Sequence, residues 1–364
     1  MKGKRFWKVL RSIATVLVLI VAAYLAYVFI AYHRLPDNQV LEVYGKSDEH
    51  PNEPASAGVP YRIVSWNIGF GAYEADYGFF MDGGTQSWAW SEERLDANLA
   101  KIGQFLSGQD ADFLLVQEID VDSTRSYHVD EYKVIEGYLN QQRDYDQTFA
   151  QNYDSPFLFY PLTQPHGASK AGIGTFADFT ITSALRRSLP IENGFTKFLD
   201  LDRCYSVSRI PVENGAELVL YNLHLSAYTS DGTIATEQLR LLLEDMQGEY
   251  EQGNYCVAGG DFNKDLLGDS AAYFGAGDKE YTWAQPIPPE TFDGVDIELV
   301  APLNKAEPVP SCRNADGPYH EGQYVLTVDG FLVSPNVKVY GAEVIDTGFA
   351  YSDHNPVYMD FTLT

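Results

Sequence analysis

The segment NYCVAGGDFN (Asn254–Asn263) decides the fold class, because a continuous apolar run ends there in a carboxylate and an amide. A short apolar run that closes on glycine is typical of a buried strand. Asp261 and Asn263 are two residues apart, so in an extended segment they face the same side. A carboxylate beside an amide can deprotonate and orient one attacking water. Gly259 and Gly260 would let the backbone approach a substrate closely.

The same pattern recurs on both sides of this segment. The stretches YRIVSWN, DFLLVQE, AELVLYNLHL and YVLTVDGFLV are strand-like and carry polar residues at or near their ends, and SDHNPV precedes a last strand. The polar residues are Asn67, Glu118, Asn222, His224, Asp329, Asp353 and His354. Because loops at strand ends build the sites of open sheets, we expect these side chains to converge.

Helical patterns alternate with these strands. Leucine and isoleucine recur at helical spacing in 92–106, and a second helix is predicted from about 234 to 251. The Asn-Gly pair at Asn214 and Gly215 predicts a hairpin between RCYSVSRIPV and AELVLYNLHL. Mixed strands with helices outside favour an α/β sandwich over an all-β protein, in one domain from 61 to 364.

Each polar residue has an ordinary interpretation when it stands alone. An Asn at a strand end is usually a turn former, a single Glu is often solvated or a helix cap, and a lone His is usually only hydrogen-bonded. Together they suggest a cation site, because Mg²⁺ prefers a few carboxylate oxygens, as from Glu118 and Asp353. If Asp329 reaches His354, it would orient the imidazole and favour its protonated form. A cationic His can stabilise charge on phosphoryl oxygens.

The ordered motifs SWNIG, VQEID, YNLHLSA, GGDFN, VDGFLVS and SDHNPV resemble those of the endonuclease/exonuclease/phosphatase superfamily over roughly residues 61–364. That superfamily includes secreted DNases, abasic-site endonucleases, inositol-polyphosphate phosphatases and neutral sphingomyelinases. The resemblance implies a four-layered sandwich of two packed mixed β-sheets flanked by helices. It also implies attack of water on a phosphoester with Mg²⁺ as cofactor, Mn²⁺ or Ca²⁺ being alternatives.

The resemblance further implies a role for each motif residue. Metal binding would fall to Asn67, Glu118 and Asp353. The catalytic residues would be Asp261 as general base, Asn263 to orient water or phosphate, His224 and His354 to stabilise the transition state, and Asp329 to orient His354.

Two departures from the superfamily pattern stand out. The segment HGASKAGIGTFADFTITSALRR replaces a clearer glycine-rich, Ser-Arg signature, so no catalytic role is assigned there. No Glu that would support His224 is identified.

Two long segments are expected to shape specificity. The aromatic loop at 70–90 could stack on a base or touch lipid, and it could equally fold on its own aromatic cluster. In the insertion at about 266–323, Arg313 and Asn314 are candidates to contact a phosphate or sugar.

The N-terminus predicts a membrane anchor. A basic segment at 1–11 precedes an uncharged run at 12–32, which is long enough to cross a bilayer. A cleaved signal peptide is the rival, but bulky residues continue the run where a small-residue cleavage site would lie. Positive charge before the helix predicts a single-pass protein with a cytoplasmic N-terminus and an extracellular catalytic domain. Residues 33–60, rich in Pro, Asp, Glu and Ser, are expected to form a stalk.

Charge narrows the substrate class. The chain has a net charge of −26, and six of its 25 basic residues lie in the first 34, where no acidic residue occurs. The remainder therefore repels polyanions, and extended nucleic acid is a disfavoured substrate.

Of the three cysteines, Cys256 fits a buried apolar run, and a Cys204–Cys312 bridge is an open alternative. The oligomeric state stays open.

These features together predict a metal-dependent phosphoester hydrolase that acts on a small or lipid-borne substrate outside the membrane. An extracellular nuclease is the alternative within the enzyme class. A catalytically silent binding module of the same fold is the alternative outside it. Six residues suited to catalysis argue together against the silent module, since a binder would not need all of Glu118, His224, Asp261, Asn263, Asp353 and His354.

Overall fold

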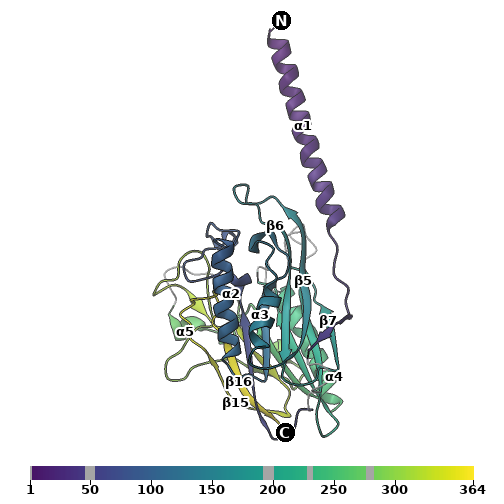
Figure 1. The fold of residues 1–364 in the computed structure, drawn as a ribbon, viewed down its shortest axis with the longest axis vertical. Coiled ribbons are helices and arrows are strands. Elements are labelled where there is room, and N and C mark those ends of the chain that lie inside the picture. The colour runs from purple at the N-terminus through teal and green to yellow at the C-terminus, as the bar shows by residue number, and fades with distance from the viewer. Residues whose placement is uncertain (1, 46–53, 192–200, 228–232, 276–282) are drawn as a thin grey trace.

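Two mixed seven-stranded sheets face each other in the computed structural model, which describes residues 2–45, 54–191, 201–227, 233–275 and 283–364 (Figure 1). The first sheet has the order β15 (Val337–Val344), β16 (Val357–Leu363), β3 (Pro60–Asn67), β4 (Phe113–Asp120), β6 (Gly167–Ala177), β5 (Asp146–Leu158) and β2 (Val43–Tyr44). The second has the order β1 (Gln39–Leu41), β7 (Ser183–Ser188), β8 (Cys204–Pro211), β9 (Glu217–His224), β10 (Tyr255–Asp261), β14 (Asp329–Val333) and β11 (Glu298–Val300).

The remaining elements lie around these sheets. The helices are α1 (Lys2–Ala31), α2 (Glu92–Ser107), α3 (Glu131–Leu139), α4 (Thr233–Glu251) and α5 (Ser270–Phe274). Short 3-10 turns occupy Gly69–Gly71, Phe80–Asp82, Thr124–Ser126 and Pro289–Phe292. A two-stranded ribbon pairs β12 (Cys312–Arg313) with β13 (Val325–Leu326).

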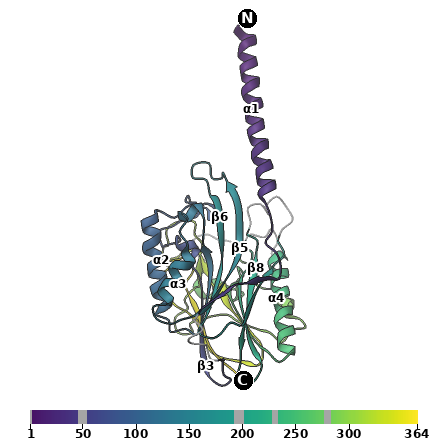
Figure 2. The same cartoon turned by 45° about the vertical axis from the view of Figure 1, so that its right-hand side comes forward.

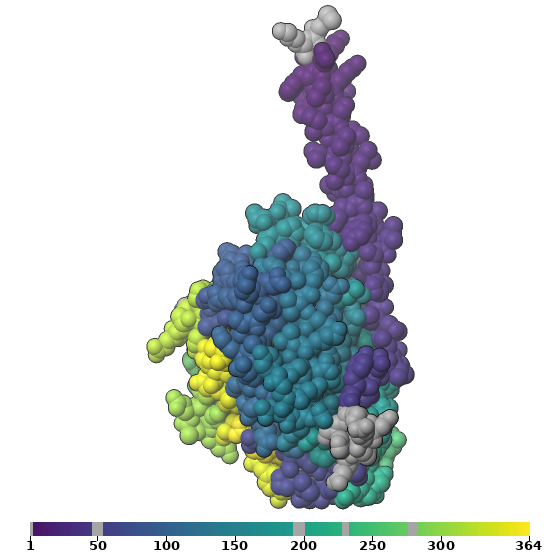
Figure 3. All heavy atoms as spheres, in the orientation of Figure 1, coloured from purple at the N-terminus to yellow at the C-terminus, as the bar shows by residue number. Residues whose placement is uncertain are grey.

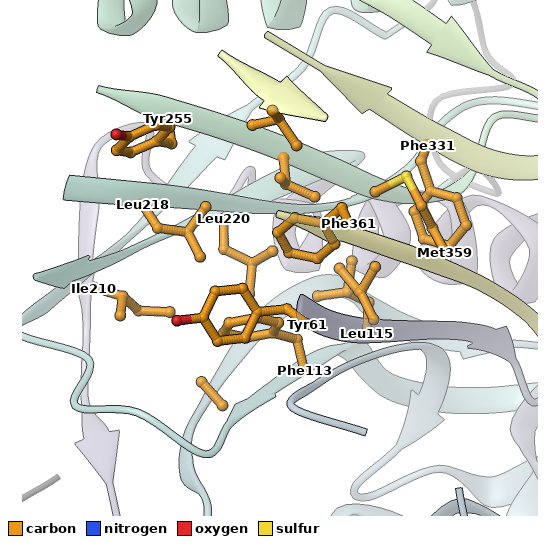
Figure 4. Packing of buried hydrophobic residues seen from close by; sticks show 14 of the residues in the cluster. Tyr61, Phe113, Leu115, Ile210, Leu218, Leu220, Tyr255, Phe331, Met359 and Phe361 are labelled. Carbon is orange, nitrogen blue, oxygen red and sulfur yellow. The ribbon is translucent and has the colours of Figure 1, made fainter. Parts of the chain in front are cut away.

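Three apolar clusters hold the layers together. Between the sheets, Phe113 and Leu115 of the first sheet pack with Leu220 of the second (Figure 4). The helices α2 and α3 cover the outer face of the first sheet, and α4 covers the outer face of the second (Figure 2). This arrangement confirms the predicted four-layered sandwich, because burial of one face of each sheet and helix drives such stacking.

Strand register places the predicted site residues at one end of the sandwich. β3 and β4 are parallel, with Asn67 opposite Gln117. β9 and β10 are also parallel, with His224 opposite Asp261, and Asp261 in turn lies opposite Asp329 of the antiparallel β14. Three neighbouring strands therefore present His224, Asp261 and Asp329 in a single row.

The two glycines of GGDFN serve packing and do not open the backbone to a substrate, which corrects the expectation for them. A Cβ on Gly260, where φ is +148°, would lie 2.0 Å from the carbonyl oxygen of Leu223. A Cβ on Gly259 would lie 2.8 Å from the ring of Phe331. Only glycine fits where β10 lies this close to β9 and to the inter-sheet core.

We expect Gly260→Ala to lower the free energy of unfolding by at least about 2 kcal/mol, because the clash is with backbone that cannot turn aside. Chemical denaturation would measure the change. Gly248→Ala in α4 is the matched control, since a Cβ there meets nothing within 4 Å. It should be neutral or stabilising by up to about 1 kcal/mol. Equal stabilities of the two variants would contradict the packing role.

The stalk expected at 33–60 is partly built into the sheets. Within it, β1 pairs with β7 at the edge of the second sheet, and β2 pairs with β5 at the edge of the first. Ala55 is buried and bridges to Val212. Residues 46–53 lie outside the described residues. The segment was expected to be a linker because its composition is polar, but edge strands need only a few apolar side chains.

Two smaller expectations are also corrected. The stretch YVLTVDGFLV was expected to be one strand, but it divides into β13 and β14. Cys204, Cys256 and Cys312 are all free and buried, so the suggested Cys204–Cys312 bridge is absent. The predicted hairpin between β8 and β9 and the predicted helices α2 and α4 are confirmed.

The apolar N-terminal helix α1 projects from one end of the sandwich (Figure 3). By length and composition it could cross a membrane, and a signal sequence would meet the same description. The helix begins at Lys2, so it includes the basic segment as well as the predicted span.

Candidate functional site

A cavity of about 150 Å³ opens at the end of the sandwich where the parallel strands finish. Eight of the ten predicted site residues line it, namely Glu118, His224, Asp261, Asn263, Arg313, Asn314, Asp353 and His354. The other two, Asn67 and Asp329, are bonded to lining residues from behind. The convergence expected from the strand ends is therefore confirmed.

Two of the lining residues have strained backbones. Glu118 has φ of 55° at an irregularity in the pairing of β4 with β6, and Asn263 has φ of 49° just after β10. Non-glycine residues in this left-handed region carry conformational strain, which persists only where surrounding structure imposes it. In both cases the turn of the backbone aims a polar side chain into the cavity.

Asn67 joins the two sheets at the cavity. Its Nδ2 donates to Glu118 Oε1 at 3.1 Å and to Asp261 Oδ2 at 3.1 Å, while its Oδ1 accepts from the Gly69 N–H at 3.0 Å. In this geometry Asn67 orients two carboxylates from behind the cavity wall, and its role as a metal ligand stays a prediction.

Asp261 is buried and has few groups to balance its charge. It accepts a hydrogen bond from the Asn263 backbone N–H at 2.8 Å as well as the one from Asn67. Burial raises the pKa of Asp261 to about 7, against the lowering effect of His354. A carboxylate whose pKa lies near neutrality is suited to take a proton from water.

His354 and Asp329 form a buried pair, as the sequence predicted. The Nδ1 of His354 lies 2.8 Å from Asp329 Oδ2, which also accepts from Ser311 Oγ at 2.7 Å. Burial alone lowers the pKa of His354, but Asp329 outweighs it, and the pKa stands well above its usual value. The imidazole is therefore a cation, with Nε2 directed toward Asp261 Oδ2 at 3.9 Å.

The loop that carries His354 is fixed from the first sheet. Trp66 Nε1 donates to the His354 carbonyl at 2.8 Å, and Ser352 Oγ donates to the Asn67 carbonyl at 2.8 Å. Both donors are fully buried. Because Trp66 and Asn67 belong to β3, that strand positions the histidine loop and the carboxylates together.

His224 differs from His354 in charge. Its Nε2 lies 3.6 Å from Asp261 Oδ2 and 3.7 Å from Glu118 Oε1. Burial, with Arg203 and His354 nearby, holds its pKa well below the usual value, so the ring is neutral. Within the described residues no group bonds to its Nδ1, in keeping with the absence of a supporting Glu from the sequence pattern.

The donor set of this cavity fits a hard divalent cation. Glu118, Asp261 and Asp353 line one small space. Burial, together with the nearby charge of Glu118, raises the pKa of Asp353 to about 6 against the lowering effects of His354 and Arg313. A bound cation would stabilise the ionised form of such carboxylates, and a set of oxygen ligands suits Mg²⁺. Asp261, Asp329 and His354 also bring ligand atoms within 4.8 Å of one another, and the bond between Asp329 and His354 engages one atom of each of those two residues.

Arg313 and Asn314 lie at the cavity wall with most of their donors engaged. Arg313 is buried and donates to the carbonyls of Glu74 and Gly317, both at 3.0 Å. Its Nε has no partner among the described residues. Asn314 donates to the Asp82 carbonyl at 3.3 Å. Arg313 thus fixes the aromatic loop to the insertion, and substrate contact by either residue stays a prediction.

Several cavity residues were not found from the sequence. Arg125, bonded to Asp120 at 2.8 and 2.9 Å, lies 3.9 Å above the Phe70 ring. Arg203 and Cys312 also line the cavity, and the thiol of Cys312 lies 3.5 Å from His354 Nε2. A basic residue soon after VQEID was the only signal for Arg125, and nothing in the local sequence marks the other two.

The aromatic loop mostly folds on itself, which was one of its two expected arrangements. Phe70, Tyr73 and Tyr77 are buried and pack with ring centroids 5.0 to 6.3 Å apart. Phe79 and Met81 continue to the cavity wall, and Met81 is exposed.

Asn222 has a structural place in the fold. Its side chain accepts from Gln117 Nε2 at 2.8 Å and donates to the Gly174 carbonyl at 2.8 Å. Gln117 belongs to β4 of the first sheet and Asn222 to β9 of the second, so their bond ties the sheets together beneath the cavity.

Solved structures with this fold are numerous. An endonuclease/exonuclease/phosphatase from Beutenbergia cavernae DSM 12333 superposes with a TM-score of 0.53 at 17% identity, covering 84% of this chain and 72% of that one. The human nocturnin catalytic domain with bound sulfate gives 0.53 at 17% identity, covering 89% and 97%. ANGEL2, a 2′,3′-cyclic phosphatase in complex with adenosine-2′,3′-vanadate, gives 0.55 at 15% identity, covering 89% and 99%.

At these identities the structural likeness establishes the fold. No curated protein matched the sequence. The profile of the endonuclease/exonuclease/phosphatase family matches residues 64–354, which include every predicted site residue and most of the chain. The chain therefore belongs to the endonuclease/exonuclease/phosphatase family.

Proposed function

We propose that the chain is a divalent-metal-dependent phosphoester hydrolase, held in a membrane by α1, that acts on a small or lipid-borne phosphoester outside it. The family consists of phosphoester hydrolases, which supports the reaction class. The observation that carries the proposal is the meeting of a buried base, Asp261, with a cationic His354 at one acidic cavity. Sulfate in nocturnin and vanadate in ANGEL2 are phosphate-like oxyanions bound by proteins of this fold.

The residues divide the chemistry between them. Asp261 takes a proton from the attacking water, which Asn263 helps to orient beside it. His354 places positive charge against the phosphoryl oxygens, and Asp329 keeps it protonated and in place. Glu118 and Asp353 would hold Mg²⁺, which supplies Lewis-acid stabilisation of phosphoryl charge when bound. Neutral His224 offers a hydrogen bond at the same wall.

A single assay set tests this proposal. The full chain, purified in detergent, is given Mg²⁺ and offered a chromogenic phosphodiester, phosphoinositides, sphingomyelin and duplex DNA, with a chelator control. Hydrolysis that needs the metal is expected on one or more of the small or lipid substrates. Preference for DNA would favour the extracellular nuclease, and inactivity on every substrate would favour the silent binding module.

We expect Glu118→Gln to raise the Mg²⁺ concentration for half-maximal activity by at least about tenfold, because it removes one negative oxygen ligand. Mn²⁺ binding followed by electron paramagnetic resonance should weaken in parallel, which gives a readout independent of turnover. Glu343→Gln is the control, since Glu343 is exposed on β15 and accepts a hydrogen bond from Tyr358 at 2.9 Å. Unchanged Mn²⁺ affinity in the Glu118 variant would exclude Glu118 as a ligand.

A further inference from the structure

The cavity lies at the end of the sandwich from which α1 projects. β16 begins with Val357 beside Ser65 and ends with Leu363 near the C-terminus. The C-terminus lies at the far end of the molecule from α1 (Figures 1 and 2). β3 runs opposite to β16, so Asn67 and the cavity lie at the end that faces α1.

The hairpin of β5 and β6 extends past the cavity toward α1. Ala171 of β6 lines the cavity and pairs with both Asp120 of β4 and Tyr153 of β5. β5 then continues for five residues to Leu158, roughly 15 Å at the rise of a strand. The loop that closes the hairpin lies near the end of α1 in both ribbon views.

This hairpin is bonded to the last turns of α1. The Tyr24 hydroxyl donates to the Phe157 carbonyl and accepts from the Phe159 N–H, both at 3.2 Å. The Tyr27 hydroxyl accepts from the Phe157 N–H at 3.1 Å. The rings of Tyr24 and Phe159 meet edge to face, 5.0 Å between centroids. Two tyrosines thus satisfy backbone groups of the hairpin that would otherwise face lipid.

The contact sets the depth of the hairpin tip. Tyr24 lies eight residues before the end of the predicted span at 12–32, which is roughly 12 Å along the helix. The contact therefore brings the hairpin tip within the thickness of the bilayer that this span would cross. At this level the tip exposes Phe159 (51%), Tyr160 (68%) and Leu162 (84%). Large apolar side chains are seldom left in water as a group, but they are stable in the apolar part of a bilayer.

The apolar surface continues from the tip to the cavity. Tyr160 packs against Phe80 with 5.8 Å between ring centroids, and Phe80 packs against Phe79 at 4.7 Å. Phe79 and its near neighbour Met81 line the cavity, and Met81 is 52% exposed.

We propose that the β5–β6 tip inserts into the bilayer that α1 crosses, and that the cavity therefore opens toward the membrane and takes the phosphoester of a lipid headgroup. This inference rests on the proposed function and narrows its substrate class. Beyond residue 34 the chain carries 19 basic and 51 acidic residues, so its contact with the bilayer is apolar and does not depend on anionic lipid.

The first experiment measures the contact without using activity. Leu162→Cys in the full chain is labelled with an environment-sensitive fluorophore and reconstituted in phosphatidylcholine vesicles. Quenching by a nitroxide lipid is expected at this position. Tyr340→Cys is the control, because Tyr340 is 60% exposed on β15 and bonds Thr362 close to the opposite end. Equal lack of quenching at both positions would overturn the insertion.

The second experiment measures the consequence for the substrate. The variant with Phe159→Ser, Tyr160→Ser and Leu162→Ser is compared with Tyr340→Ser on a fluorogenic phosphodiester carried by a lipid and on soluble bis(p-nitrophenyl) phosphate. We expect kcat/KM on the lipid to fall by at least about tenfold, because losing the interfacial partition of even one of the three large apolar side chains has an effect of that size. Soluble turnover should change less than twofold.

The outcomes separate the two proposals. Unchanged lipid hydrolysis in the triple variant would overturn the lipid-headgroup assignment. An equal loss on both substrates would indicate damage to the fold and would also count against the lipid-headgroup assignment. The assignment would stand in that case only if the labelled Leu162 variant is quenched and retains lipid turnover. If the wild type hydrolyses neither substrate, the proposed function fails, while the quenching result still decides whether the tip contacts the bilayer.

Discussion

Replacing Asp261 by Asn is expected to lower kcat by about 10³- to 10⁴-fold, because the change removes the base that takes the proton from water. The amide nearly preserves the shape of the carboxylate, and its oxygen can still accept from the Asn263 N–H. Steady-state kinetics on a soluble phosphodiester would measure the loss. Asp146→Asn is the matched control, since Asp146 is also buried and accepts from the Ile181 N–H at 2.9 Å, but lies away from the cavity.

The pH dependence gives the same residue a second test. Burial raises the pKa of Asp261 to about 7, and the protonated form cannot act as a base. Activity at low Mg²⁺ should therefore rise as the pH increases through about 7. The midpoint should move to lower pH as Mg²⁺ saturates, because a cation favours the ionised carboxylate. If the residual activity of Asp261→Asn still rose with pH through the same range, another group would be the base.

The positions of the main site residues could be predicted because each lies where an apolar strand turns polar. Asp261 and His224 close such runs, and Glu118 follows one at the irregularity within β4, and neighbouring strands bring these residues to one edge. What each residue contacts was harder to predict. Asn67 donates one bond to Glu118 of its own sheet and one to Asp261 of the other sheet, and nothing local in SWNIG indicates that its amide would serve the carboxylates of two strands.

The short edge strands and the buried Arg125 are features that the sequence pattern did not predict. β1 and β2 are three and two residues long, too short to carry an alternating pattern. Their partners β7 and β5 lie more than 100 residues away along the chain, so only tertiary structure brings them together. Arg125 looks like a surface residue in sequence, but its bidentate bond to Asp120 allows it to be buried beside the cavity.

Replacing His354 by Gln is expected to lower kcat by about 10²- to 10³-fold, because Gln can donate a hydrogen bond but carries no charge to stabilise the transition state. Asp329→Asn should cause a loss of similar size by another route. Asp329 is what holds the pKa of His354 well above its usual value, so without it the imidazole loses its proton at lower pH. The falling limb of the pH profile should then move toward neutrality in the Asp329 variant.

The double variant distinguishes this positioning role from two separate contributions. If Asp329 acts only through the charge and orientation of His354, removing both should reduce kcat little more than removing His354 alone. Ser311→Ala serves as the control for local packing, because Ser311 bonds the same Asp329 oxygen at 2.7 Å but leaves the carboxylate charge intact. Two other results would mean that Asp329 contributes to the reaction independently of His354. One is a loss of kcat in the double variant equal to the product of the two single losses, and the other is an unchanged pH profile in Asp329→Asn. Asp329 would then act as a member of the Asp261, Asp329 and His354 cluster that could hold a metal.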